Sequence, residues 1–524
     1  MERNIKLNRK VFILMLAALA QSELQAESLI ENIQPKSLLL QKQPGFFRFS
    51  YDTLSMPNHL SPMGLMGLVY YADLAPYVYG GVGGYGSVVG TQGGLFVLGL
   101  GGGFHAPLVA NLMGDIGFFA GGGGGRSSLV GGGLMIKPYV GLMYNFKWVR
   151  FGLHYSYIDF PDGLIRSQQI GLDLDVPLEF PYVNYHDAVN YQWKFADIFL
   201  CNQGNIGFQR NDFAIILQAY KQRAGTKNVL GEIQDGTISL IGAELDHYFT
   251  KEWFWWVKSS GAYSGIPNGY MDVLGGLGYH YPLGSTSFAL VPQLGLGAGG
   301  GGNVDSGGGV LITGQLGLEL ALGRHFATRL SGGYLVAPKG EIKAATGTVA
   351  LIYHLDIAEE GSTALPLTTN IFTQAFRIHL FNQTYLHPQR TFMSGTPPIN
   401  MVALQIDQLL SRYFFMAYQA SFAYAGNHAG GYATGMIGPG IQTAPFFNCR
   451  AEAYAEVLVG AGGGGSLALG GGSLIEPVVG LHYALTDSIG LTGSVGQLKA
   501  IKHDLNTTVI NAGITIRFGT VNQI

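Results

Sequence analysis

The stretch that most looks like a chemical site is "GGGGGRSS" at residues 121–128, where a run of glycines could cradle a phosphate. A P-loop needs Gly-Lys followed by Ser or Thr, because the lysine must reach the β- and γ-phosphates. Two similar glycine runs later in the chain continue with Asn303 and Ser466, and neither supplies that lysine. The pattern therefore favours a structural role, in which the glycines permit close packing and bulges.

Histidines and acids form no recognisable catalytic constellation. His105 and His280 occupy equivalent positions beside a proline, but a third similar segment has Gln442 or Thr443 there, and a metal site needs further ligands at close spacing. A Ser–His–acid or carboxylate–His site depends on geometry, which 13 scattered histidines do not reveal. The sequence therefore predicts no catalytic, cofactor-binding or metal-binding residue, and it favours a protein that is not an enzyme.

Three aspartates, Asp73, Asp246 and Asp407, each precede an aromatic segment. We interpret them as turn-forming residues at strand ends rather than as a ring of carboxylates in a lumen, because Asp is a common turn residue. The aromatic residues that follow the second and third of these aspartates are interpreted as part of a belt at a membrane interface. They are Trp253, Trp255, Trp256, Tyr413, Phe414 and Phe415.

These features recur because the chain carries one glycine frame three times. Its paired glycine runs are residues 121–125 and 131–133, 299–302 and 307–309, and 462–465 and 470–472. Upstream similarities lengthen each copy, so we predict β repeats at residues 46–178, 213–355 and 376–519, the last with a closing strand. Residues 179–212 and 356–375 are predicted to be linkers.

Within each copy, apolar residues alternate with small or polar ones, which is the pattern of strands with two different faces. We count about eight such strands per copy, and about 24 in all. An even count suits an antiparallel barrel. The polar face supplies the candidate lumen-facing residues, which are Gln169, Asp173 and Asp175, Thr313, Gln315 and Glu319, and Thr515 and Arg517.

Composition and the first residues indicate export to a membrane. Only 12% of the residues are charged while 47% are hydrophobic, and the net charge of −3 makes nucleic acid an unsuitable partner. Basic residues precede the apolar run "VFILMLAALA" (11–20), so we predict a signal peptide at residues 1–26. No later run approaches the ~20 apolar residues of a spanning helix, which leaves a closed β-barrel as the structure that satisfies its backbone in lipid.

In these features the sequence resembles outer-membrane β-barrel proteins of Gram-negative bacteria, without matching one particular family. Such proteins typically end on a strand with a polar residue, a glycine and two spaced hydrophobics, which Asn511, Gly513, Ile516 and Phe518 fit. The tail "GTVNQI" after Phe518 departs from that pattern, since many members stop on the aromatic residue. The resemblance implies a location in the cell outer membrane, contact with its lipid, and insertion by the barrel assembly machinery.

The favoured reading is an all-β protein with one antiparallel transmembrane barrel of about 24 strands, acting as a porin-like channel or translocation pore for a solute that the sequence does not identify. The alternative is three tandem eight-stranded barrels with filled interiors, in a non-conducting surface, adhesion or structural protein. A lipid-modifying outer-membrane enzyme and a secreted β protein are the remaining readings.

Overall fold

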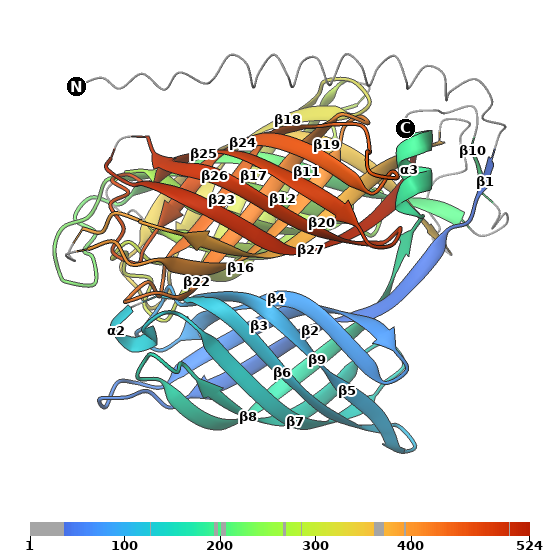
Figure 1. Cartoon of the computed structure of the whole chain (residues 1–524). Helices are drawn as coiled ribbons and strands as arrows, with labels where there is room; N and C mark the ends of the chain where they lie inside the picture. The colour runs from blue at the N-terminus through green and yellow to red at the C-terminus, as the bar shows by residue number, and fades with distance from the viewer. Residues whose placement is uncertain are drawn as a thin grey trace.

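The computed structural model describes residues 36–125, 127–192, 198–200, 206–265, 269–284, 286–360, 371–391, 395–501 and 503–523. The chain is built of antiparallel strands that close into three rings, which we name barrels 1, 2 and 3 in chain order (Figure 1). The predicted signal peptide lies outside the described residues. No helix within the described ranges is both long enough and apolar enough to cross a bilayer.

Barrel 1 contains eight strands and is drawn in blue to teal in Figure 1. They are β2 (Gln41–Leu54), β3 (Met63–Ala75), β4 (Val78–Val89), β5 (Phe96–Val109), β6 (Leu112–Gly124), β7 (Met135–Asn145), β8 (Arg150–Asp159) and β9 (Arg166–Tyr182). The last strand returns to the first, since β9 pairs with β2 from Gln41 opposite Tyr182 to Tyr51 opposite Leu172.

Barrel 2 has the same plan. Its strands are β11 (Ile206–Gln222), β12 (Thr237–Tyr248), β13 (Trp253–Ser264), β14 (Met271–Tyr279), β16 (Phe288–Gly300), β17 (Val310–Ala321), β18 (Phe326–Val336) and β19 (Lys343–Glu360), and the short β15 (Tyr281–Pro282) pairs with β16. The ring closes where β19 pairs with the whole of β11, from Ile206 opposite Glu360 to Gln222 opposite Ala344.

Barrel 3 completes the series. Its strands are β20 (Ile371–Tyr385), β21 (Ile399–Leu409), β22 (Phe414–Ala425), β23 (Ala433–Gln442), β24 (Ala451–Gly463), β25 (Ser473–Ala484), β26 (Ile489–Ala500) and β27 (Asn506–Gln523). The ring closes where β27 pairs with β20, from Ile371 opposite Gln523 to Tyr385 opposite Val509. Among the described residues, two pairs near the ends of β19 and β27 join the ladders of barrels 2 and 3.

The prediction of one barrel of about 24 strands is therefore wrong, and the alternative of three eight-stranded barrels describes the structure. The physical reason is that the eighth strand of each copy pairs with the first strand of the same copy, over 11 residue pairs in barrel 1, 17 in barrel 2 and 15 in barrel 3. A closed ring has no free edge to continue into the next copy. The predicted linkers are also too long, because strands occupy residues 179–182, 206–212, 356–360 and 371–375.

Short elements lie outside the rings. Helix α2 (Ser127–Val130) is in the β6–β7 loop, and helix α3 (Tyr185–Tyr191) follows barrel 1. A parallel pair joins β1 (Lys36–Leu38) to β10 (Ile198–Leu200). Figure 1 shows α3 and this pair at the same end of the molecule as the C-terminus.

The two faces of each barrel differ as the alternation predicts. On β9, Ile170, Leu172 and Leu174 are exposed on the outside, whereas Gln169 and Asp173, which alternate with them, are buried inside. Similar exposed rows of Leu, Ile and Val occur on strands of barrels 2 and 3. The exterior is therefore apolar and the interior carries most of the buried polar groups.

The glycine runs lie where the barrels touch. The fifth strand of each barrel packs against the third strand of another, which pairs β6 with β22, β16 with β4, and β24 with β13. A Cβ added to Gly300 would lie 2.7 Å from the backbone nitrogen of Gly94, and one added to Gly122 would lie 2.5 Å from the carbonyl oxygen of Phe422. Only glycine permits backbones to approach this closely.

Backbone hydrogen bonds cross two of these contacts at equivalent places. The Gly93 amide donates to the Gly307 carbonyl at 2.9 Å between barrels 1 and 2, and the Gly430 amide donates to the Gly131 carbonyl at 2.9 Å between barrels 3 and 1. At the centre, Phe96, Ala298 and Phe422, one from each barrel, form a common apolar cluster. The three contacts therefore follow a pseudo-threefold arrangement.

Candidate functional site

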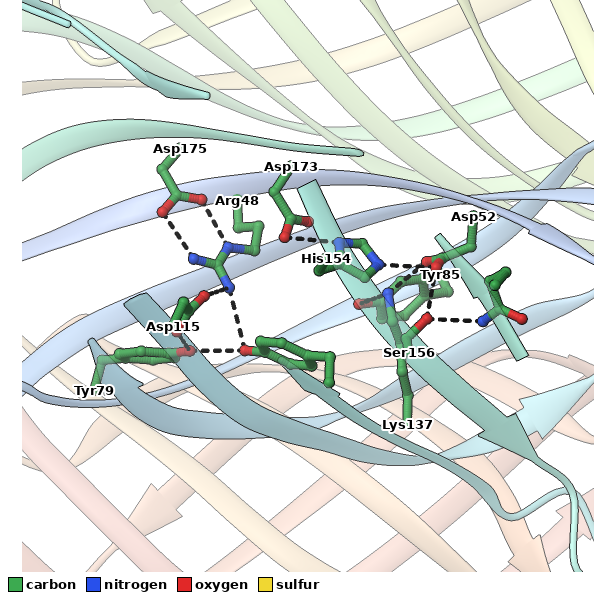
Figure 2. A network of polar contacts seen from close by, with 12 residues as sticks. Arg48, Asp52, Tyr79, Tyr85, Asp115, Lys137, His154, Ser156, Asp173 and Asp175 are labelled. Atoms are coloured by element: carbon green, nitrogen blue, oxygen red, sulfur yellow. Dashed lines mark hydrogen bonds and ion pairs between the residues drawn. The ribbon is translucent and has the colours of Figure 1, made fainter. Parts of the chain in front are cut away.

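The interior of barrel 1 is cross-linked through the guanidinium of Arg48 (Figure 2). This group on β2 forms two hydrogen bonds with the carboxylate of Asp175 on β9, at 2.7 and 2.9 Å. It also lies 2.6 Å from Asp115 on β6, whose carboxylate accepts a 2.6 Å hydrogen bond from the Tyr79 hydroxyl. Because β6 stands opposite β2 in the ring, Arg48 bridges the lumen.

A second buried centre in barrel 1 surrounds Lys137 on β7 (Figure 2). Its ammonium group contacts Asp52 on β2 and donates to the Tyr85 hydroxyl at 3.3 Å. Asp52 also lies 2.9 Å from Nε2 of His154, whose Nδ1 lies 2.8 Å from Asp173. The exposed fraction of Lys137, Asp52, His154 and Asp173 is 2% or less.

These contacts suit a brace better than a catalytic site. Cations and carboxylates on different strands are paired, and such pairs hold a small ring together because removing one partner leaves an uncompensated buried charge. An eight-stranded barrel also has an interior just wide enough for side chains to fill. The interior of barrel 1 is therefore a packed core.

Barrel 2 is braced by different residues. Arg329 on β18 contacts Glu244 and Asp246, which both lie on β12 across the ring, the latter at 3.2 Å. Arg329 also lies 3.8 Å from Glu319 on β17. The carboxylate of Glu319 is 3.2 Å from Nε2 of His280.

Barrel 3 uses Arg377 on β20. Its guanidinium lies 3.1 Å from Asp407 on β21 and 3.2 Å from Glu452 on β24, so it too reaches across the ring. Asp407 is also 2.9 Å from Nε2 of His379, whose Nδ1 lies 2.8 Å from the hydroxyl of Thr515.

His379, Asp407 and His482 are the group whose potential ligand atoms come close enough for a metal ion, within 4.8 Å of one another, among the described residues. The rings of His379 and His482 are stacked with centroids 4.8 Å apart and an interplanar angle of 11°. Imidazole lone pairs lie in the ring plane, so stacked rings do not direct them at one point. The Asp407 carboxylate is also paired with the Arg377 guanidinium, whose positive charge would repel a metal ion at this place. The geometry therefore favours packing over metal binding.

Helix α3 covers the mouth of barrel 3. The Thr373 hydroxyl donates to the Ala188 carbonyl at 2.7 Å, and the Gln192 amide donates to the Leu409 carbonyl at 2.6 Å. The Tyr185 ring lies 5.0 Å from the Arg517 guanidinium. Burial raises the pKa of the Tyr185 hydroxyl, which therefore stays neutral beside that cation. The helix thus contacts β20, β21 and β27 at one end of the ring.

The structure places the candidate lumen residues in all three barrels. Seven are buried, and Arg517 is half-buried at the mouth covered by α3; the buried ones are Gln169, Asp173, Asp175, Thr313, Gln315, Glu319 and Thr515. Asp173, Asp175, Glu319 and Thr515 contact the basic side chains described above. That any of them lines a solute path stays a prediction.

Two interpretations of single residues are wrong. Asp246 and Asp407 are not turn residues, since both are buried and paired with Arg329 and Arg377. The interpretation of the aromatic segments as an interfacial belt is wrong for Trp256 and Phe415, because alternation sends both side chains to the interior, where they are buried.

The basic residues of the braces are functional features that the sequence reading missed. They are Arg48, Lys137, Arg329 and Arg377. The signal that could have found them is a lone cation at an inward position of an alternating strand, such as Arg48 between Phe47 and Phe49.

Comparisons with known proteins identify no family for this chain. No protein-family model matches the sequence, and no curated protein matches it. Similar solved structures include OccK11 (OpdR) of Pseudomonas aeruginosa, with 9% identity, coverage of 91% of this chain and 96% of that one, and a TM-score of 0.21. A mutant of the ferric enterobactin receptor (PfeA) of Pseudomonas aeruginosa has 9% identity, coverage of 93% and 81%, and a TM-score of 0.26.

A bacterial polysaccharide outer membrane secretin has 8% identity, coverage of 90% and 98%, and a TM-score of 0.21. At these TM-scores none of the three carries an argument about function. The closed antiparallel rings with apolar exteriors and polar interiors agree with the resemblance to outer-membrane β-barrel proteins, without indicating one family.

Proposed function

We propose that this chain is a non-conducting outer-membrane protein, in which three fused barrels anchor in the bilayer and the loops provide a surface for contacts. The observation that carries the proposal is the bridging of each lumen by a buried arginine, Arg48, Arg329 or Arg377, held by carboxylates on other strands. A solute crossing any barrel would have to break these pairs, and each break would leave a buried charge unpaired.

The membrane location is supported by the exterior. The strands of the three barrels have 9–18 residues, which is enough for the ~9–11 residues that a tilted strand needs to cross a bilayer. Exposed aromatic residues cluster near the short turns of all three barrels, as in the interfacial girdles of membrane barrels. They include Phe146, Trp148, Trp253, Phe288, Phe326, Phe414 and Phe447.

The orientation follows from the connections. Outer-membrane barrels have short periplasmic turns and longer extracellular loops. The short turns, α3 and the C-terminus share one end, and the glycine loops lie at the other. The glycine loops, together with the connection of residues 223–236, therefore form the proposed external surface.

A porin-like channel for an unidentified solute is the second candidate. The feature that favours it is that buried polar and charged side chains run through all three interiors. If a rearrangement broke the ion pairs, water could enter the lumens along these polar side chains and open a path for a solute.

Conductance in a planar bilayer separates the two candidates. The purified full-length chain is expected to insert, as judged by protease protection and a heat-dependent shift in gel mobility, while giving no stable conductance steps. A Lys42→Ala variant, altered at an exposed ion pair at the mouth of barrel 1 and away from the buried arginine pairs, serves as the control. Large stable steps from the wild-type chain would refute the non-conducting function and support the channel.

Insertion by the barrel assembly machinery remains part of the proposal. The candidate closing signal, Asn511, Gly513, Ile516 and Phe518, lies on the last strand, β27. Phe518 also stacks on Phe376 of β20, with ring centroids 5.7 Å apart. Phe518→Ala is expected to accumulate unassembled in the periplasm. Refolding of the same variant into detergent in vitro distinguishes an assembly defect from lost stability.

A further inference from the structure

A cavity of about 490 Å³ lies where barrels 2 and 3 meet beneath loops of barrel 1. Its walls are the outer faces of closed barrels: Ile241 and Ala243 of β12 face it from barrel 2, and Leu404, Ala420 and Ile437 face it from barrel 3. These faces continue into exposed apolar residues elsewhere. The cavity is therefore separate from the braced lumens.

The cavity is bounded by features described above. Glycine loops of all three barrels cover one end, and they contribute Gly94, Gly125, Gly302, Gly431 and Gly464. Tyr418, another wall residue, meets Phe213 of barrel 2 in an edge-to-face contact, with ring centroids 4.7 Å apart. Val229 of the 223–236 connection also lines the space, and its neighbours Leu230 and Ile233 are exposed. Apolar residues thus extend from the cavity to its rim.

The chemistry of these walls selects an apolar occupant. Water in a cavity needs several polar partners. Glycine is the most frequent wall residue and most of the others are apolar, while Ser260, Gln419 and Thr434 are buried on the inward side of their strands, so few polar side chains are left to hold water. An empty space of this size would deprive the lining atoms of dispersion contacts. The volume lies in the range of about 300–1,000 Å³ that is usual for small-ligand sites.

We propose that this cavity binds an acyl chain of a phospholipid from the surrounding bilayer, which is held between barrels 2 and 3 under the glycine loops. The inference rests on the proposed membrane location and does not depend on the absence of conductance. We assign the bound lipid to the bilayer because the cavity walls belong to the same outward faces of the barrels that carry the exposed apolar residues.

The test fills the cavity from one wall. Gly435 is an exposed, outward-facing residue of β23 that lines the cavity, and a Cβ added there meets nothing within 4 Å. Gly435→Phe therefore places a ring in the space without displacing backbone. Gly347 on β19 is also exposed with nothing within 4 Å of an added Cβ, but it lies outside the cavity, so Gly347→Phe is the matched control.

The full-length chain is reconstituted in phosphatidylglycerol vesicles whose acyl chains carry a photoreactive diazirine, then exchanged into mild detergent. Lipid retained per protein is measured by native mass spectrometry. Gly435→Phe is expected to retain about tenfold less lipid than wild type or Gly347→Phe, because its ring occupies the binding volume. Equal retention by the two variants would overturn the proposal, as would wild-type protein that retains no lipid.

Photolysis identifies which part of the protein the lipid acyl chain contacts. Before detergent exchange, labelling is expected around the whole exterior, including peptides with Val349 and Leu351. In a second sample that is irradiated after the exchange, labelling should remain in peptides with Ile241 and Ile437. It should be absent from the other peptides. Persistent labelling without that preference contradicts the cavity site. Absence of labelling at Val349 and Leu351 before exchange would instead contradict the membrane location.

Discussion

Barrels 1 and 3 share one plan and fill the same inward position with opposite charges. Lys137, Thr313 and Glu476 each stand six residues after the first glycine of the second run in their copy, and all three are buried. In barrel 1 the Lys137 ammonium is paired with Asp52. In barrel 3 neither carboxylate oxygen of Glu476 has a hydrogen-bond partner among the described residues.

The difference shows that the ring does not prescribe its own interior. Backbone pairing closes each barrel, and inward side chains then need only fill the space and compensate one another. Barrel 1 compensates its charges through pairs across the lumen. Barrel 3 leaves Glu476 and the ring nitrogens of His482 without partners in the described part of the chain, and it carries α3 over its mouth.

The largest expected effect comes from breaking the pair in barrel 1. Lys137→Met keeps much of the side-chain volume but leaves Asp52 without its cation, so we expect a loss of about 3–5 kcal/mol in the free energy of unfolding. Urea unfolding in detergent, followed by gel mobility, provides the measurement. The double variant Lys137→Met/Asp52→Asn should recover part of the loss. If the single variant is as stable as wild type, barrel 1 is not braced by this pair.

The opposite sign is expected in barrel 3. Glu476→Gln replaces a buried carboxylate that has no partner with a neutral amide, so unfolding should require about 1–3 kcal/mol more free energy. Glu319→Gln in barrel 2 is the contrasting control, because Glu319 lies 3.2 Å from His280 and 3.8 Å from Arg329. That control should lose stability. A destabilised Glu476→Gln would show that the Glu476 charge is compensated.

A smaller effect is expected at the helix that distinguishes barrel 3. Thr373→Val removes the hydrogen bond to the Ala188 carbonyl while preserving shape, which should cost about 1 kcal/mol. Faster hydrogen exchange of the α3 amides would reveal the loosened helix. Unchanged exchange in α3 would mean that this bond does not hold the helix on the mouth.

The smallest effect is expected at an exposed ion pair at the mouth of barrel 1. Lys42 and Glu179 form a 2.9 Å ion pair whose side chains are 37% and 58% exposed. Lys42→Ala should change stability by about 0.5 kcal/mol or less, since exposed pairs are screened by water. A loss comparable to that of Lys137→Met would mean that burial does not explain the difference between the sites.

The sequence predicted the parts of the fold that depend on local pattern. Alternation around Asp173 and Leu172 correctly separates inside from outside, and the repeat correctly gives eight strands per copy. The sequence could not predict how the barrels close. The eighth strand of each copy can pair with the first strand of its own copy or with the first strand of the next copy, and tertiary structure decides between the two.

The ion-pair partners of the inward-facing charged residues also could not be predicted from the sequence. Arg48 and Asp175 are 127 residues apart and meet only because β2 and β9 close the ring. The role assigned to the aromatic segments failed for a local reason. Trp253 and Trp256 stand three positions apart on one strand, so the pleat sends them to opposite faces.

The glycine contacts between barrels have a consequence for how such a chain can vary. In a trimer of identical subunits, every change to the interior would appear three times, and assembly would depend on subunit concentration. Here the covalent connections supply a high effective concentration, so weak contacts through Gly94, Gly122 and Gly300 suffice to keep the barrels together. The interior residues of each copy can then change independently, and the difference between Lys137 and Glu476 is an example.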